Sequence, residues 1–269
     1  MQRIAVLGAN GRMGLALIRL IAASDSAVLA GALTEPGHAT VGRDAGQLAG
    51  LDVLGVALTD QLAVALAACD VAIDFTAPAA TAKHAQACVA RGCGLVVGTT
   101  GLSAAELAAL KSAAGSIALL YSRNMSIGIT VLTELVRQAA RLLGPGFDAE
   151  ISEAHHRAKK DAPSGTALQL GEALAEARAQ KFADVAIYDR SGVSAGRPAG
   201  AIGFASIRAG SIVGDHTVLL ASDEEVLELT HRATDRALFA RGALRAAGWL
   251  QDQPAGLYSM QDVLGLSAR

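Results

Sequence analysis

Short apolar runs alternate with helix-spaced segments along the first half of the chain. Each run is bounded by glycine or polar residues, as is typical of buried parallel strands. Strands are predicted at residues 4–7, 28–33, 71–75, 95–97 and 117–121, and helices at 12–23, 64–69, 81–91 and 104–114. This alternation predicts an α/β domain with a doubly wound parallel sheet.

The pattern changes near Asn124, where a second domain is expected to begin. Its predicted helices span 129–143 and 167–179, and its predicted strands span 148–154, 185–188, 204–209, 216–221 and 225–231. A polar stretch covers 155–166 and a glycine-rich segment covers 192–203. Short turns join the last three strands, which indicates an antiparallel or mixed sheet. The chain is predicted to be helical again over 236–250.

Composition narrows the class of protein. Of 269 residues, 52% are hydrophobic and 18% are charged, which argues against a disordered chain and allows two domains. A formal net charge of -2 gives no electrostatic reason to expect a nucleic-acid partner. No apolar run approaches the ~18 residues of a membrane span, and the N-terminal run is too short for a secretion signal. Cys69, Cys88 and Cys93 show no metal-like spacing, so we expect reduced thiols in a cytoplasmic protein.

A glycine-rich turn follows the first predicted strand. Gly8, Gly11 and Gly14 form the pattern G-x-x-G-x-x-G immediately before the first helix. In a dinucleotide-binding turn, these glycines permit a tight turn, a close approach to pyrophosphate and close helix–strand packing. The helix N-terminus also offers N–H groups to anionic oxygens. Glycines in such a turn can be purely structural, but the strand–helix context predicts a dinucleotide site.

Two side chains near this turn bear on the choice of cofactor. Glu35 follows the second strand, where a carboxylate bonds the ribose hydroxyls of NAD and repels the extra phosphate of NADP. It can equally be an ordinary exposed residue before Pro36. Arg12 competes with the first interpretation, because it can neutralise a pyrophosphate or a 2′-phosphate. These residues therefore leave the choice between NADH and NADPH open.

Three further loops follow predicted strands at the carboxyl edge of the sheet, where doubly wound sheets bind ligands. The loops are residues 74–76, 98–101 and 122–125. Each can be a simple turn, but their common placement predicts that at least one contacts the cofactor.

The most informative polar stretch, residues 153–166, combines two histidines, three cations and two carboxylates ahead of a helix. A zinc site needs further ligands at metal spacing, and the adjacent histidines do not supply them. A solvated basic loop is the plain alternative. In an anion-binding acid–base site, His155 or His156 donates a proton and Lys159 binds a carboxylate or protonates an anion. The helix N-terminus at 164–166 adds an anion nest, which suits a substrate bearing carboxylates.

These residues resemble the 4-hydroxy-tetrahydrodipicolinate reductase family, also called dihydrodipicolinate reductases. The run EAHHRAKKDAPSGTA at 153–167 is similar to the family signature, and its His–His–Lys–Ser–Gly–Thr pattern is highly specific. The other similar segments, in chain order, are 8–14, 74–76, 97–101, 202–204 and 208–216. The resemblance therefore covers nearly the whole chain.

The resemblance implies an NAD(P)H-dependent reduction that yields tetrahydrodipicolinate, a cyclic dicarboxylate, in the diaminopimelate route to lysine. It implies a Rossmann-like domain of residues 1–125 plus 237–269. It also implies a mixed α/β (α+β) domain at 126–236 that binds substrate and assembles a homotetramer.

The resemblance also implies roles for individual residues. His155 corresponds to the family's proton donor and acceptor, and Lys159 to its proton donor. His156, Gly165 and Thr166 match substrate contacts. The implied cofactor contacts are Gly8, Ala9, Asn10, Gly11, Arg12, Met13, Gly98, Thr99, Thr100, Ser122, Arg123, Asn124 and Met125.

Two departures from the family pattern concern the cofactor. Some members place an arginine that serves NADP after the glutamate that follows the second strand, and Pro36 follows Glu35 here. This favours NADH, with Glu35 as a contact. Met125 stands where some members have phenylalanine, so an apolar contact to the nicotinamide remains without aromatic stacking.

The implied reaction needs an acid for the ring nitrogen once hydride reaches the conjugated imine. His155 and Lys159, neighbours on one helical turn or one folded loop, are expected to share that task. One alternative is another two-domain dehydrogenase, of the homoserine or aspartate type, which does not need the His–His–Lys–Ser–Gly–Thr run. A nicotinamide-binding regulatory protein is a second alternative, and it has no need of His155 and Lys159.

Overall fold

The computed structural model describes residues 1–192 and 196–266, so part of the glycine-rich segment at 192–203 lies outside the described residues. The chain forms two compact units. The first comprises Met1–Met125 and the chain from Ala237 onward, and the second comprises Ser126–Arg236.

The first unit is built on a seven-stranded sheet in the order β12-β6-β5-β4-β1-β2-β3, in which all neighbouring strands run parallel. Continuous apolar runs form its central strands, which are buried because helices cover both faces. The strands are β1 (Gln2–Leu7), β2 (Ala27–Leu33), β3 (Leu58–Thr59), β4 (Val71–Asp74), β5 (Gly94–Val97), β6 (Ala118–Tyr121) and β12 (Gly256–Tyr258).

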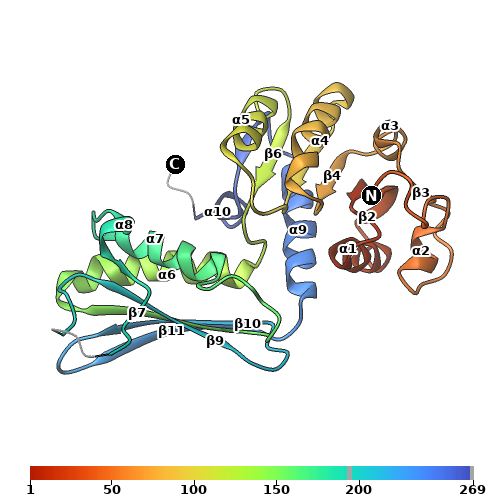
Figure 1. Cartoon of the computed structure of the whole chain (residues 1–269). Coiled ribbons are helices and arrows are strands. Elements are labelled where there is room, and N and C mark those ends of the chain that lie inside the picture. The colour runs from red at the N-terminus through yellow and green to blue at the C-terminus, as the bar shows by residue number, and fades with distance from the viewer. Residues whose placement is uncertain (193–195, 267–269) are drawn as a thin grey trace. The chain divides into compact units, whose positions relative to one another are not determined.

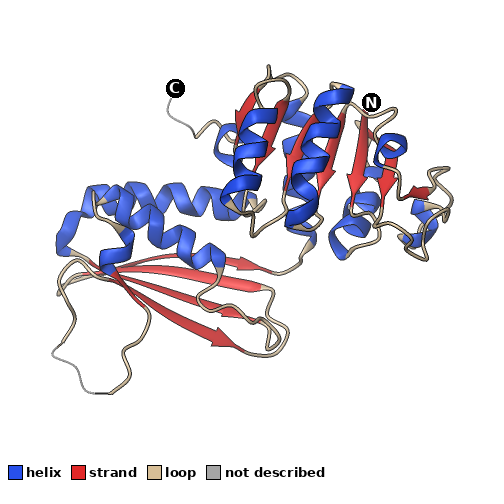
Figure 2. Ribbon diagram, turned by 45° about the horizontal axis from the view of Figure 1, so that its top comes forward, coloured by secondary structure: helices blue, strands red, loops and turns tan. Residues whose placement is uncertain are grey.

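The helices of the first unit lie on the two faces of this sheet (Figures 1 and 2). α1 packs against α9 on one face, and α4 packs against α5 on the other. A capping box between Ser103 and Glu106 starts α5, and Gly92 in the left-handed region ends α4. The helices are α1 (Arg12–Ala22), α2 (Ala45–Leu48), α3 (Leu62–Ala65), α4 (Pro78–Arg91), α5 (Ala104–Ala113), α9 (Ala237–Leu250) and α10 (Met260–Val263).

A close backbone approach holds α9 in the first unit. A β-carbon at Gly242 would lie 1.8 Å from the carbonyl oxygen of Met125. Only glycine therefore allows α9 to pack this closely against the backbone of Met125.

The second unit has a five-stranded sheet in the order β11-β10-β7-β9-β8. β10 pairs antiparallel with β7 and β11, whereas β9 pairs parallel with β7 and β8. The sheet is therefore mixed. Its strands are β7 (Asp148–His155), β8 (Ala186–Ile187), β9 (Ile202–Arg208), β10 (Gly214–Ala221) and β11 (Val226–Ala233).

One face of this sheet packs against α6 (Ile127–Leu143) and α7 (Gly165–Ala177), and the apolar core lies between them. Ser126 caps α6 by accepting a hydrogen bond from the N–H of Ile129. A short 3-10 helix, η1 (Gly144–Gly146), follows α6, and α8 (Phe182–Val185) precedes β8. Among the described residues, no helix covers the opposite face of the sheet (Figure 2).

The predicted fold class is confirmed: a doubly wound parallel sheet and a second, mixed sheet. Most predicted bounds differ from the observed ones by one to three residues, and two short elements differ most in proportion to their length. The helix expected at 64–69 lies at Leu62–Ala65, and the strand expected at 185–188 is only Ala186–Ile187. Five α-helices and strands were not predicted, namely α2, β3, α8, β12 and α10, because none is long enough to show a hydrophobic period.

The three cysteines are free and buried, in agreement with the expectation from their spacing. Across residues 1–192 and 196–266, no helix has both the length and the apolar character needed to cross a membrane.

Candidate functional site

The glycine-rich turn joins β1 to α1 at the carboxyl edge of the parallel sheet. Gly8 has a φ of 83°, and a β-carbon at Gly14 would lie 2.2 Å from the carbonyl oxygen of Gly8. Both positions therefore require glycine. Gly11 is the N-cap of α1 and provides no side-chain hydrogen bond to the first turn. The N-terminus of α1 is thus available to an anionic ligand such as a pyrophosphate.

A cavity of about 600 Å³ opens beside this turn, within the size range of cofactor sites. Four of the predicted cofactor residues line it, namely Gly8, Asn10, Gly11 and Glu35. Phe75 and Thr76, from the loop 74–76 that the sequence singled out, also line it. The rest of the wall was not identified from sequence and consists of Leu33, Thr34, Pro36, Asp60, Leu62, Ala77, Ala80, Lys83 and His84.

Glu35 lies against the glycine-rich turn. Its Oε2 accepts hydrogen bonds from Asn10 Nδ2 at 3.1 Å and from Thr34 Oγ1 at 3.3 Å. Hydrogen bonding by its own backbone N–H and by Asn10 lowers the pKa of Glu35 below the ordinary value. The cavity wall therefore carries an ionised carboxylate. Arg12 is exposed and is not among the described residues that line the cavity.

A fully buried carboxylate, Asp74, ties the next loops together. Its Oδ1 accepts hydrogen bonds from the N–H and Oγ1 of Thr76, at 2.9 and 2.6 Å, and from Thr99 Oγ1 at 3.1 Å. His84 Nδ1 donates to Oδ2 at 2.8 Å. The loops at 74–76 and 98–101 are therefore held side by side, after the neighbouring strands β4 and β5 at the carboxyl edge of the sheet.

The other predicted cofactor residues lie outside the cavity wall. Gly98, Thr99 and Thr100 follow β5, and the segment 122–125 follows β6, the next strand of the sheet. Ser122 Oγ donates to the carbonyl of Asn124 at 2.7 Å. Met125 is buried, with 2% of its surface exposed. Ala9 is fully buried, whereas Arg123 is exposed.

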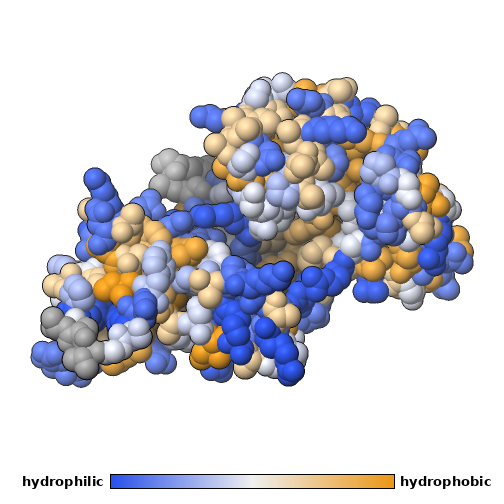
Figure 3. Space-filling view, in the orientation of Figure 1, coloured by the Kyte–Doolittle hydropathy of each residue, from blue (hydrophilic) through white to orange (hydrophobic). Residues whose placement is uncertain are grey.

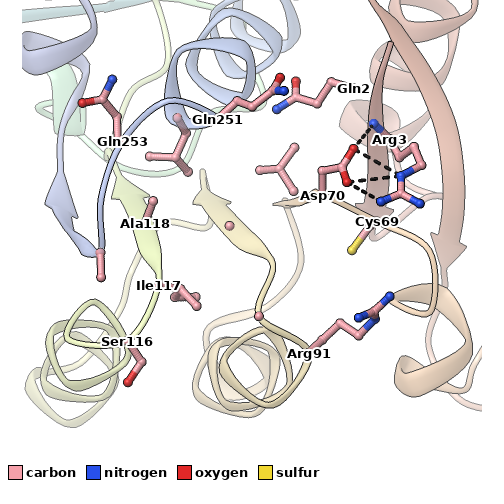
Figure 4. A pocket seen from close by; sticks show the side chains of 15 residues that line it. Gln2, Arg3, Cys69, Asp70, Arg91, Ser116, Ile117, Ala118, Gln251 and Gln253 are labelled. Atoms are coloured by element: carbon pink, nitrogen blue, oxygen red, sulfur yellow. Dashed lines mark hydrogen bonds and ion pairs between the residues drawn. The ribbon is translucent and has the colours of Figure 1, made fainter.

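A second cavity, of about 510 Å³, lies at the opposite, amino-terminal edge of the same sheet (Figure 4). Its charged walls are already paired. Arg3 Nη2 lies 2.6 Å from Asp70 Oδ1, and Arg91 donates to the carbonyl of Ala67. None of the predicted site residues lines this cavity, so it is not the candidate site.

In the second unit, β7 ends with Glu153 and His155 on one face of the sheet, because strand side chains alternate. The carboxylate of Glu153 is buried, and its Oε2 lies 2.5 Å from His155 Nδ1. Two guanidinium nitrogens of Arg208, on β9, donate to its two oxygens at 2.9 and 2.7 Å. Burial raises the pKa of Glu153, but hydrogen bonds from Arg208, Ser206 and His155 together outweigh burial, and the net pKa is lowered.

His155 is 9% exposed and packs edge-on against His216, with 5.1 Å between the ring centres. Burial, with the nearby charges of Lys159 and Arg208, lowers the pKa of His155 and outweighs Glu153, which raises that pKa. His216 Nε2 lies 3.1 Å from Ser164 Oγ. Burial, aided by His155, lowers the pKa of His216 to about 4. The inner histidine therefore stays neutral beside His155 near neutral pH.

Lys159 lies in a folded loop after β7. Its N–H donates to the carbonyl of His156 at 3.1 Å, and its Nζ lies 2.9 Å from Asp161 Oδ2. The expected alternative of a shared helical turn with His155 is wrong, because His155 still belongs to the strand. Arg208 also donates to the carbonyl of Asp161 at 2.6 Å, and this bond holds the loop near Glu153.

The N-terminus of α7 adjoins the same cluster. Ser164 caps the helix by accepting from the N–H of Ala167, and its own N–H donates to Glu153 Oε1. Gly165 and Thr166 are the first helical residues, and Gly165 is exposed with open space at its β-carbon position. Hydrophilic side chains gather on the surface where β7 and β9 end (Figure 3). An exposed helix N-terminus beside a lysine and a histidine can bind a carboxylate.

Three supporting residues of this cluster were given no role from sequence, namely Glu153, Arg208 and His216. The two-residue alternation of Glu153 with His155 was a usable signal, whereas the pairing of β7 with β9 was not visible in the sequence. Among the described residues, no group of three or more histidine, cysteine or carboxylate side chains is arranged to hold a metal ion.

These features define a two-domain α/β protein with a nucleotide-binding turn in one unit and an acid–base cluster in the other. Residues 2–125 match the family model for the N-terminus of dihydrodipicolinate reductase, and residues 128–264 match the model for its C-terminus. The chain belongs to the dihydrodipicolinate reductase family, and it is an oxidoreductase.

Individual relatives agree with this assignment. The chain is 52% identical over 270 residues to a 4-hydroxy-tetrahydrodipicolinate reductase of Anaeromyxobacter sp. (strain Fw109-5), covering 100% of both chains. It is 52% identical over 264 residues to the protein of that name from Alkalilimnicola ehrlichii, covering 98% of this chain and 99% of the relative. The dipicolinate-bound dihydrodipicolinate reductase from Paenisporosarcina sp. TG-14 shares the fold, with a TM-score of 0.78, 22% identity and coverage of 97% and 98%.

Proposed function

We propose that the protein reduces 4-hydroxy-tetrahydrodipicolinate to tetrahydrodipicolinate with NAD(P)H, in the diaminopimelate route to lysine. The observation that carries this proposal is the cluster at the end of β7. There a buried carboxylate holds His155, while Lys159 and the N-terminus of α7 adjoin it. Relatives of the same length that are about half identical bear the name of this reductase.

The residues of the first unit fit a dinucleotide. The close contacts at Gly8 and Gly14 keep the turn free of side chains, and the first turn of α1 has no side-chain cap. Bound NAD(P)H supplies a hydride to the substrate. We assign cofactor contacts to the glycine-rich turn through Met13, to Glu35, to Gly98–Thr100 and to Ser122–Met125. The ionised Glu35 favours NADH, because a 2′-phosphate beside it meets a like charge.

His155 and Lys159 are proposed to be the acids. Reduction of a conjugated ring imine leaves the ring nitrogen in need of a proton. His155 Nε2 and Lys159 Nζ are the two candidate donors, and a positioned acid of this kind contributes roughly 10²–10⁴-fold to the rate. Lys159 carries its charge next to Asp161 and also attracts the substrate's carboxylates.

The substrate's carboxylates are assigned to the N-terminus of α7. Gly165 leaves its backbone N–H accessible because it has no side chain, and Thr166 adds a hydroxyl. His156, half-buried beside the loop, is the third proposed substrate contact. The local cations explain how a chain with a net charge of -2 binds a dianion.

We further propose that the protein is cytoplasmic and forms a homotetramer. Its buried, free thiols suit a reducing compartment. The sheet face opposite α6 and α7 exposes apolar side chains, including Ile207 and Val226, which suits contact with other copies of the chain.

The decisive experiment measures oxidation of NADH and of NADPH, with and without freshly generated 4-hydroxy-tetrahydrodipicolinate. Substrate-dependent oxidation that is faster with NADH is expected. Oxidation only with an amino-acid semialdehyde or a related substrate supports the alternative dehydrogenase. Cofactor binding without oxidation of either cofactor supports the regulatory alternative.

A further inference from the structure

The carboxylate of Glu153 faces His155 and cannot itself reach solvent. It is 2% exposed, and each of its two oxygens already accepts a hydrogen bond from Arg208. A third bond comes from the N–H of Ser164 at 3.2 Å. A carboxylate this fully bonded is a poor proton acceptor, because its neighbours stabilise the ionised form.

The contact with His155 fixes which ring nitrogen can act. An ionised carboxylate only accepts hydrogen bonds, so His155 Nδ1 must be the donor across the 2.5 Å contact. The proton that the ring exchanges is therefore on Nε2. Gly214 lies on that side of the ring, and a β-carbon there would lie 3.0 Å from Nε2.

We propose that Glu153, itself held by Arg208, is a positioning residue that fixes the ring of His155 through Nδ1 and leaves Nε2 to exchange the proton with substrate. This inference rests on the proposed role of His155 as an acid. In the proton step, Nε2–H breaks, the proton passes to the substrate, and Nε2 later regains a proton from solvent. Nδ1–H stays in place, and Glu153 remains ionised throughout.

The ion pair between Glu153 and Arg208 has a simpler explanation, namely that it only joins β7 to β9. The two explanations differ in what happens at His155. A joining role predicts that removing the carboxylate affects stability and leaves the kcat of the folded variant unchanged. A positioning role predicts that the same change lowers the pKa of His155 and mixes its two neutral tautomers, because the carboxylate raises that pKa and fixes Nδ1–H.

The test begins with Glu153→Gln, which keeps the shape of the side chain and removes its charge. We expect kcat to fall at least tenfold, on the order of what the loss of an orienting carboxylate costs elsewhere, with little change in KM. The alkaline limit of the kcat profile should move to lower pH. Glu150→Gln is the matched control, because Glu150 is an arginine-paired carboxylate on the same strand that faces the other side.

Nitrogen NMR of histidine-labelled protein measures the tautomer and the titration midpoint of His155. A change in stability alone would not alter the tautomer. In the native protein, Nδ1 of His155 should stay protonated while Nε2 titrates. In Glu153→Gln, both nitrogens should share the proton and the midpoint should lie at lower pH. Four charged or titratable groups face His155, namely Glu153, Lys159, Arg208 and His216. Only Glu153 is substituted, so the shift in the titration midpoint of His155 reports the loss of its carboxylate.

A double-mutant cycle that combines Glu153→Gln with His155→Ala tests whether Glu153 acts through His155. If Glu153 acts through His155, the double variant should have the same kcat as His155→Ala alone. An additional loss in the double variant, or unchanged kcat and titration in Glu153→Gln, overturns the inference. If His155→Ala itself keeps full kcat, the proposed acid role fails first, and the inference fails with it.

Glu153→Gln leaves Arg208 with an unpaired, largely buried charge, which can prevent folding. Glu153→Gln combined with Arg208→Gln replaces the ion pair with two neutral amides. If Glu153→Gln does not fold, the same measurements on this double-amide variant, namely kcat, the titration of His155 and the double-mutant cycle, decide whether Glu153 positions His155. A folded double-amide variant with native kcat and a native His155 midpoint overturns the inference.

Discussion

Lys159 is one of the two proposed acids, so its removal should have a large effect on rate. Lys159→Ala should lower kcat by roughly 10²–10⁴-fold and raise KM far less, because a proton is transferred mainly in the transition state. Steady-state kinetics with saturating NADH measures both constants. Lys111→Ala, which removes an exposed lysine on α5, is the control. A kcat for Lys159→Ala within twofold of the native value would contradict the assignment.

His216 makes the stability of the protein depend on pH. Its pKa is about 4 in the folded protein, against an ordinary value near 6.5, so the unfolded chain binds more protons between these values. Stability should therefore fall as the pH drops from 6.5 to 4, by about 3 kcal/mol from this residue at about 1.4 kcal/mol per unit. The charged and titratable groups that act on it are His155, Glu153, His231 and Lys159.

His216→Gln should remove that part of the pH dependence, because an amide does not titrate. The measurement is the free energy of unfolding in urea at several pH values from 7 to 4. The native protein should lose more stability than the variant across this range. His38→Gln, at a partly exposed histidine of the first unit, should behave like the native protein. If the free energy of unfolding falls with pH equally in the native protein and in His216→Gln, His216 does not cause the loss of stability.

The sequence indicated the candidate acid–base residues, but it did not indicate the side chains that contact and hold them. His155, Lys159 and the helix start at Gly165 lie within one short segment, so their types and spacing suggested an acid–base site. The contact of Glu153 with Arg208 joins residues 55 positions apart through the pairing of β7 with β9. Strand order is not encoded in local spacing, so this contact could not be predicted.

Among the elements, α9 has the most restrictive packing contact. Gly242→Ala should destabilise the first unit by about 1–3 kcal/mol, because the new methyl group meets the backbone of Met125. Gly248→Ala on the same helix meets nothing within 4 Å and should stabilise it by about 0.5–1 kcal/mol. Thermal unfolding of the two variants gives a direct comparison. Equal melting temperatures would show that the close approach is not needed.

Long elements were predictable from sequence and short ones were not. α6 spans seventeen residues, and its apolar face repeats over several turns. β3 and β12 have two and three residues, too few for a period, and neighbouring strands rather than their own sequence place them. The mixed order of the second sheet was left open for the same reason, since β9 joins β7 in parallel after a long excursion of the chain.

For the whole molecule, the proposed tetramer gives a test of the uncovered sheet face. Ile207, on β9, is 54% exposed on this face, so Ile207→Asp should weaken assembly by placing a charge in an apolar contact. Light scattering after size-exclusion chromatography should give four chains for the native protein and fewer for the variant. Leu142→Asp, at an 86% exposed leucine of α6, is the matched control. A native protein that elutes as a single chain would contradict the proposal.

The return of the chain to its first unit has a consequence for synthesis on the ribosome. The strands through β6 emerge first, but α9 and β12, which complete that unit, follow only after the second unit has been made. At typical translation speeds, the intervening roughly 110 residues take roughly 5–20 s. During that interval β6 is an open edge, and the surfaces of β4 and β5 that α9 covers remain exposed to water. The second unit is continuous in sequence and is free to fold first, so the nascent first unit is the part that chaperones have reason to protect.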